Sequence, residues 1–96
     1  MLYLISYDVS TTTPAGRKRL RHVAKACENC GVRVQNSVFE CVLPYEGLLM
    51  LKNELEHIMD TTQDSLRIYP MGKNGRDKII HLGLNHSFDV EAPIII

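Results

Sequence analysis

The stretch LYLISYDV, residues 2–9, decides how the rest of the chain is interpreted. It is rich in β-formers and apolar on both alternating faces, which is typical of a central strand covered on both sides. Asp8 ends that pattern with a carboxylate. The stretch therefore predicts a central strand that carries an acidic side chain at its end.

A helix is expected after this strand. Thr13 before Pro14 suits an N-cap followed by proline at the first helical position, and Gly31 suits the C-terminal stop. The apolar stripe between them has helical spacing and consists of Leu20, Val23, Ala24 and Cys27. Residues 32–43 are β-branched and aromatic around a polar centre, which predicts a hairpin.

The remaining elements complete a βαββαβ order. An apolar stripe predicts a second helix from Tyr45 to Met59, and alternation predicts a fourth strand from Asp64 to Met71. This order fits a ferredoxin-like α+β sandwich in which both helices cover one face of an antiparallel sheet. The other face is expected to be buried against a symmetric partner, giving a homodimer.

The C-terminal part is expected to add to this sandwich. Residues 1–80 are assigned to the ferredoxin-like domain, and residues 81–96 to a C-terminal strand and tail that contact the dimer or a partner. Lys78 to Leu82 could form a fifth strand that pairs across the dimer by edge addition. The tail ending in Ile94, Ile95 and Ile96 is expected to dock likewise.

Composition fits one small folded domain. Hydrophobic residues make up 45% of the 96 residues and charged residues 23%, which argues against intrinsic disorder. With no basic leader and no apolar run of membrane-spanning length, a cytoplasmic protein is expected. Three cysteines, Cys27, Cys30 and Cys41, do not make a secreted disulfide framework, and one C-x-x-C pair is a weak zinc signal.

Charge is balanced in total but uneven along the chain. Eleven Lys and Arg match eleven Asp and Glu, so the net charge gives no indication of nucleic acid. Basic residues nevertheless crowd one stretch of the first predicted helix, namely Arg17, Lys18, Arg19, Arg21 and Lys25. Such a cluster is often only a solvated helix face, but here it favours contact with phosphates.

Four segments occur in an order and spacing that resembles the small CRISPR-associated proteins of the Cas two family. They are LYLISYDV with Tyr7 and Asp8, GRKRLRHVAK from Gly16, RVQNSVFEC from Arg33 to Cys41, and DSLRIY from Asp64. The third segment is the most specific, and the match is looser after Gly72. Cys30 stands where the family commonly has an aromatic residue.

The resemblance implies a ferredoxin-like homodimer that works with the larger Cas one integrase in acquiring CRISPR spacers. It also implies an endonuclease that cleaves RNA or DNA with Mg²⁺. In the family the aspartate that ends the first strand is the catalytic metal site, and here that position is Asp8. One Mg²⁺ shared by the two Asp8 residues of a dimer would follow, because Mg²⁺ is commonly held by one or two carboxylates.

Other roles are carried over residue by residue. Arg33 and the basic helix are implied in nucleic-acid handling, and Tyr7, Ser37 and Phe39 are treated as supporting residues. Without the resemblance, Asp8 reads as a strand-end aspartate that caps the following loop through local backbone bonds. Ser37 lacks any evident base as a nucleophile, and Phe39 reads by default as a core or dimer residue.

Three function hypotheses stay open. The first is a Mg²⁺-dependent endonuclease in CRISPR adaptation, and the alternative is a non-catalytic dimeric platform that holds DNA for the integrase. The third is a small regulatory domain that binds metabolites, which the basic helix opposes. The sequence does not decide whether the preferred substrate is RNA, single-stranded DNA or duplex DNA. It also leaves open whether cleavage is needed for adaptation, and whether the dimer must rearrange to bind metal.

Overall fold

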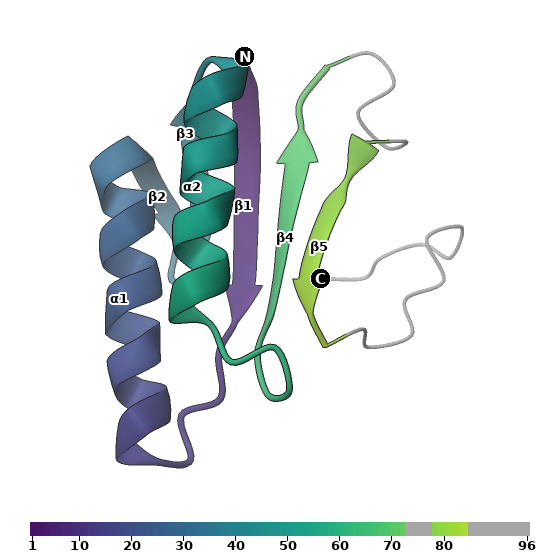
Figure 1. Ribbon diagram of the computed structural model, residues 1–96. Coiled ribbons are helices and arrows are strands. Elements are labelled where there is room, and N and C mark those ends of the chain that lie inside the picture. Colours follow the sequence, from purple (N-terminus) through teal and green to yellow (C-terminus); the bar gives the residue numbers. More distant parts are fainter. Residues whose placement is uncertain (73–77, 85–96) are drawn as a thin grey trace, which may run out of the picture.

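The computed structural model describes residues 1–72 and 78–84. In them the chain forms a five-stranded antiparallel sheet of strand order β2-β3-β1-β4-β5, with two helices on one face (Figure 1). The elements are β1 (Leu2–Asp8), α1 (Pro14–Cys30), β2 (Gly31–Gln35), β3 (Val38–Val42), α2 (Tyr45–Ile58), β4 (Ser65–Pro70) and β5 (Ile80–Gly83). The predicted α+β ferredoxin-like order is confirmed, with β1 at the centre of the sheet.

The start of α1 follows from its local sequence. The Thr13 Oγ1 accepts a hydrogen bond from the Gly16 backbone N–H at 3.1 Å, and Pro14 occupies the first turn, as predicted. Gly16 is buried against the preceding loop, and a side chain there would overlap the Ser10 carbonyl oxygen. The helix therefore packs directly on the backbone that leaves β1.

The core lies between the sheet and the two helices. Val23, Ala26 and Cys27 of α1 pack in the core with Leu48, Leu51 and Leu55 of α2. These residues form one cluster with the β1 side chains Tyr3, Ile5 and Tyr7. From the predicted helical stripe, Leu20 and Ala24 lie partly buried at the edge of this core. The predicted hairpin is confirmed, and its turn lies at residues 36–37 between β2 and β3.

Strand β5 pairs with β4 of the same chain. Its register places Leu82 opposite Leu66 and His81 opposite Arg67. A strand from Lys78 to Leu82 that pairs across the dimer was expected. In the structure β5 instead pairs with β4 of its own chain and is the outermost strand on that side of the sheet. The expected docking of residues 94–96 lies outside the described residues. Among the described residues, no helix is long and apolar enough to cross a membrane.

The second face of the sheet carries no helix in the part of the chain that the structure describes. Because side chains alternate along a strand, Leu4, Ser6 and Asp8 of β1 point to this face, together with Arg67 and Tyr69 of β4. We call this surface the open face. It is the face that was expected to contact a second copy of the chain.

Candidate functional site

Asp8 lies on the open face, at the end of β1. It is exposed, and its partner in the register with β4 is Ser65. Two loops meet at this end of the sheet, because β1 runs into the loop before α1 and residues 59–64 lead into β4. The carboxylate is thus held on a regular strand and remains accessible to a ligand.

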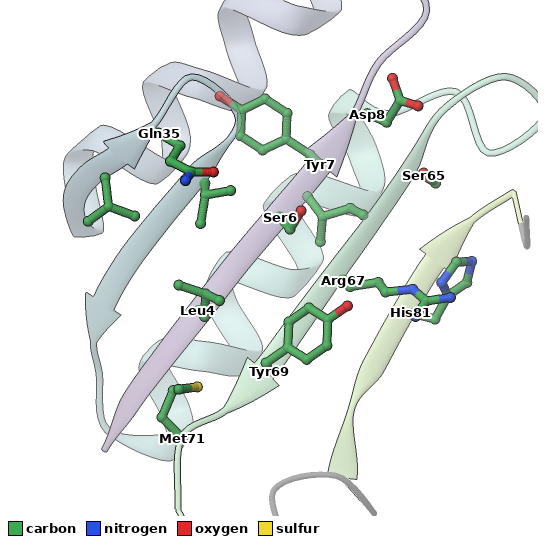
Figure 2. Close-up of a pocket in the computed structure, with 13 residues that line it drawn as sticks. Leu4, Ser6, Tyr7, Asp8, Gln35, Ser65, Arg67, Tyr69, Met71 and His81 are labelled. Carbon is green, nitrogen blue, oxygen red and sulfur yellow. The ribbon is translucent and has the colours of Figure 1, made fainter. Parts of the chain in front are cut away.

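A hollow of about 730 Å³ runs along the open face from Asp8. Figure 2 shows Asp8 and Ser65 at one end of it, with Arg67 and His81 further along. Its apolar lining is made of Leu4, Val34, Val38, Leu66, Tyr69 and Met71. An apolar surface with a few polar groups at one end is typical of a contact site for another molecule.

One chain supplies only part of a metal site. Among residues 1–72 and 78–84, no group of three or more His, Cys, Asp or Glu side chains could hold a metal ion. Near Asp8, the Ser65 hydroxyl is the oxygen-bearing side chain that the strand register brings closest. Hard cations such as Mg²⁺ bind through oxygen ligands and keep several waters, so Asp8 and Ser65 of one chain offer oxygen ligands of the right type but too few for a complete metal site.

Tyr7, although next to Asp8 in sequence, belongs to the opposite face. It is 5% exposed, its ring lies 6.1 Å from the Phe39 ring between centroids, and its hydroxyl donates to the Asn36 carbonyl at 3.4 Å. Burial raises the pKa of the Tyr7 hydroxyl above its ordinary value. Tyr7 and Phe39 therefore support the core beneath the site, and the structure does not bring them to Asp8.

Arg33 and Ser37 flank this aromatic pair. The Arg33 guanidinium lies 5.1 Å from the Phe39 ring centroid and donates to Glu28 Oε1 at 3.2 Å. Ser37 lies in the hairpin turn, and its carbonyl oxygen accepts from the Tyr7 backbone N–H at 3.1 Å. Arg33 is half exposed, so its guanidinium keeps access to solvent beside the stacked rings.

Four of the five basic residues of α1 form an exposed surface. We call it the basic face, and its members are Arg17, Lys18, Arg21 and Lys25. Since α1 covers the opposite side of the sheet from the open face, these side chains and Asp8 do not share a surface. Figure 1 shows that β1 ends and α1 begins at the same end of the molecule. A long nucleic-acid strand could therefore reach both only by passing around that end.

Arg19, the fifth basic residue, is turned away from this surface. Its Nε donates to Asp64 Oδ2 at 2.8 Å and its Nη2 to Asp64 Oδ1 at 3.4 Å. The hydrogen bond to Asp64 raises the pKa of the Arg19 guanidinium. The Arg19 side chain is 16% exposed and that of Asp64 is fully buried.

Sequence reasoning missed Asp64, which was taken only as the start of a strand. The signal that could have found it is an acidic residue directly before an apolar strand, since a carboxylate so close to core positions can become buried. A buried carboxylate needs several donors, and a nearby arginine is the usual source. The basic residues of α1 were the candidates.

Two of the three cysteines are inaccessible in the structure. Cys27 and Cys41 are buried, and Cys30 is partly exposed. Burial raises the pKa of the Cys27 thiol to about 12 and that of Cys41 to about 11, so neither forms a thiolate at neutral pH. Burial also raises the pKa of Cys30. A redox role for the Cys27 and Cys30 pair is disfavoured.

His22, His57 and His81, the histidines within the described residues, do not gather around Asp8. His22 is exposed on α1, and a His57 ring nitrogen lies 2.7 Å from the Asn53 carbonyl oxygen of its own helix. His81 lies on β5 beside Arg67, with Nε2 at 3.2 Å from the Gly83 carbonyl oxygen. His81 lies at the hollow because β5 pairs with β4. This pairing was not predicted from the sequence.

Comparison with known proteins identifies a family that this chain matches over most of its length. The family model described as CRISPR associated protein Cas2 matches residues 1–79. A CRISPR-associated endonuclease Cas2 from Halalkalibacterium halodurans is 54% identical over 95 residues, which cover 99% of each chain. A CRISPR-associated endoribonuclease Cas2 from Nitratidesulfovibrio vulgaris is 49% identical, covering all of this chain and 94% of the relative.

Solved structures carry the same fold. The crystal structure of Streptococcus pyogenes Cas2 at pH 6.5 superimposes with a TM-score of 0.71 and 52% sequence identity, covering 86% of this chain and all of that one. A hypothetical protein from Thermus thermophilus superimposes with a TM-score of 0.66 at 37% identity, covering 74% of this chain and 80% of the other.

Proposed function

The chain belongs to the CRISPR associated protein Cas2 family, and from this premise we propose that it is a metal-dependent endonuclease acting on phosphodiester backbones. The names of its relatives, endonuclease and endoribonuclease, support a nuclease role. The observation that carries the proposal is the exposed Asp8 carboxylate at the end of a central strand, on a largely apolar open face.

The active form is a homodimer built on the open face. That face is apolar around Leu4, Val38 and Tyr69, and covering it with a second copy removes this surface from water. Twofold symmetry then brings a second Asp8 to the site that one chain leaves incomplete. The proposed cofactor is one Mg²⁺ held by the two Asp8 carboxylates.

The chain's own groups then have defined tasks. The Asp8 carboxylates would hold the metal, and Ser65 is the residue beside Asp8 in the strand register. When bound, Mg²⁺ supplies a more acidic water as the nucleophile and offsets charge on the phosphate. The dimer contact keeps bulk water from the apolar hollow, which strengthens the electrostatic contribution of the site.

Substrate binding is assigned to the basic face and to Arg33. Lys and Arg contacts to phosphates provide affinity without sequence information, which suits a nuclease that accepts many sequences. The same contacts serve RNA and DNA, so the geometry favours neither.

A second candidate function is a non-catalytic dimeric platform that holds DNA for the Cas one integrase during spacer acquisition, as the family resemblance implies. One observation favours it: the basic face lies on the opposite side of the sheet from Asp8, so DNA held there does not need the carboxylate. We place both activities in the cytoplasm, where the free cysteines stay reduced.

The deciding experiment compares wild type with Asp8→Asn, which keeps the size of the side chain and removes its charge. We expect Asp8→Asn to form an intact dimer and to lose cleavage of RNA and DNA at every Mg²⁺ concentration tested. Glu40→Gln is the matched control, because Glu40 is an exposed carboxylate on the neighbouring strand, opposite Leu4.

Each result assigns a function. Wild-type cleavage by dimeric Asp8→Asn would overturn the nuclease proposal for this site. Loss of cleavage together with full spacer integration in the presence of the integrase would show that the platform role is separate from the nuclease.

A further inference from the structure

The Asp64 carboxylate is the centre of a buried hydrogen-bond network near Asp8. It accepts from the Ser10 backbone N–H at 3.0 Å, from the Asp60 backbone N–H at 3.0 Å, and from two nitrogens of Arg19. Its side chain is fully buried. A buried charge is stable only when it is paired and its remaining lone pairs are satisfied, and these donors meet that requirement.

This network joins three segments that lie far apart in the sequence. Ser10 belongs to the loop after β1, Arg19 to α1, and Asp60 to the turn after α2. The Asp64 backbone belongs to the network as well, since its N–H donates to the Asp60 carbonyl at 2.8 Å and its carbonyl accepts from the Leu84 N–H at 2.8 Å. The loops at this end of the sheet are therefore tied together.

Asp8 lies between two attachment points of this network. Ser10, two residues after it, is bonded to the Asp64 side chain, and Ser65, the residue after Asp64, is its partner in the register with β4. The chain that follows Asp8 is thus held by the Asp64 side chain, and the neighbouring strand opposite Asp8 begins at the residue next to Asp64.

Close backbone packing leaves little room for another arrangement. A side chain at Gly16 would overlap the Ser10 carbonyl oxygen, and one at Gly83 would overlap the Asp64 carbonyl oxygen. Gly83 also has a φ of 84°, in the region that favours glycine. Two glycines therefore allow α1 and β5 to approach the loop that the carboxylate holds.

Arg19 is the charged donor in this arrangement. Its Nε and Nη2 are used by Asp64, and only 16% of its side chain is exposed, whereas Arg21 on the same helix is exposed. The Nε–Nη2 edge, which could otherwise bind a phosphate through two hydrogen bonds, is therefore already occupied by the buried carboxylate, and little of the side chain remains exposed.

We propose that Arg19 is a positioning residue that, through Asp64, fixes the loop after β1 and so holds Asp8 in its productive place, and that it does not bind nucleic acid. This inference rests on the proposed nuclease function of Asp8. It divides the basic residues of α1 into an exposed set that binds substrate and one member that shapes the site from inside.

The first test separates turnover from binding. For Arg19→Gln we expect kcat to fall on the order of ten- to a hundredfold, because small misplacements of catalytic groups have effects of that size. KM and the Kd for a nucleic-acid substrate without Mg²⁺ should stay within about twofold, with an unchanged salt dependence. Arg19→Lys keeps the positive charge but loses the bidentate contact with Asp64, so its kcat should lie between those of Arg19→Gln and wild type.

Arg21→Gln is the matched control, because it removes the same side chain from an exposed position of the same helix. It should weaken binding and lower the slope of log Kd against log salt by about one. The double variant Arg19→Gln with Asp64→Asn should have the kcat of the worse single variant, because both changes break the same contact.

The second test does not depend on activity. Amide hydrogen exchange at Ser10 and Asp60 should speed up at least tenfold in Arg19→Gln and Arg19→Lys, while core amides of β1 stay protected. If Arg19→Gln does not fold, Arg19→Lys decides. If the Arg19 variants lose affinity for nucleic acid while exchange at the Ser10 amide is unchanged, the positioning role is overturned. Faster exchange at Ser10 with unchanged affinity supports the role. That second result stands even if Asp8→Asn is fully active, so it is independent of the proposed nuclease function.

Discussion

Tyr7 and Asp8 are consecutive in the chain but lie on opposite faces of the sheet. Tyr7 is 5% exposed and stacks against Phe39, whereas Asp8 is exposed on the open face. The alternation of side chains along a strand requires this separation. Tyr7 therefore does not point toward the surface that carries Asp8, although the two residues are adjacent in sequence.

Tyr7→Phe is expected to have a small effect. It keeps the stacked ring and removes one hydroxyl whose bond to the Asn36 carbonyl is long, so unfolding free energy should fall by about 1 kcal/mol or less. Tyr7→Ala should cost about 3–5 kcal/mol, because it leaves a cavity beside Phe39. Urea unfolding of both variants measures this. A tenfold loss of cleavage in a fully stable Tyr7→Phe would mean instead that the hydroxyl takes part in the reaction.

A charge placed on the open face should break the dimer. Val38→Lys puts an ammonium group into the apolar lining of the hollow, so we expect a folded monomer and loss of cleavage, because the second Asp8 is lost. Met50→Lys is the control, since Met50 is 73% exposed on α2, on the other side of the sheet. Light scattering coupled to gel filtration gives the masses. A dimeric Val38→Lys would place the subunit contact elsewhere.

Thiol modification should be selective for Cys30. Burial raises the pKa of Cys27 to about 12 and that of Cys41 to about 11, and both side chains are inaccessible, so neither should react in the native protein at pH 8. Ellman's reagent should label about one thiol per chain before urea is added and three afterwards, and Cys30→Ser should remove the native reaction. Rapid native labelling of Cys27 would contradict the buried arrangement.

Asp60 should titrate below its usual range. Hydrogen bonds from the Thr62 hydroxyl, the Thr62 backbone N–H and Gln63 lower the pKa of this carboxyl group. Because the pKa of Asp60 is lower in the folded than in the unfolded protein, the ionised carboxylate stabilises the fold. This stabilisation is fully present at pH values above the unfolded pKa of about 3.9, and it is lost as the pH falls through the folded pKa. Thr62→Val should raise the Asp60 pKa, observed by carboxyl carbon NMR. An unchanged pKa would assign the shift to another cause.

Local signals in the sequence were enough for most of the fold. Thr13 and Pro14 marked the start of α1 and Gly31 its end. A run of β-formers that is apolar on both faces marked β1, and alternation marked β4, because caps and residue patterns depend on neighbours in the chain. The pairing of β5 with β4 was not predicted, since strand partners are chosen by contacts distant in sequence. The predicted position of Asp8 at a strand end is confirmed, whereas Arg19 was predicted to be one of the phosphate-binding basic residues and is found bonded to the buried Asp64.

The sequence by itself determined the order of elements, the central strand with Asp8 at its end, and the charge of α1, because each of these is set by residue type and spacing along the chain. Only the tertiary structure decided which of the charged side chains of α1 face solvent and which are used inside the fold. Arg17 and Arg21 face solvent, whereas Arg19 meets Asp64 across 45 positions of sequence, and it does so because a buried carboxylate must find a charged donor wherever the fold provides one.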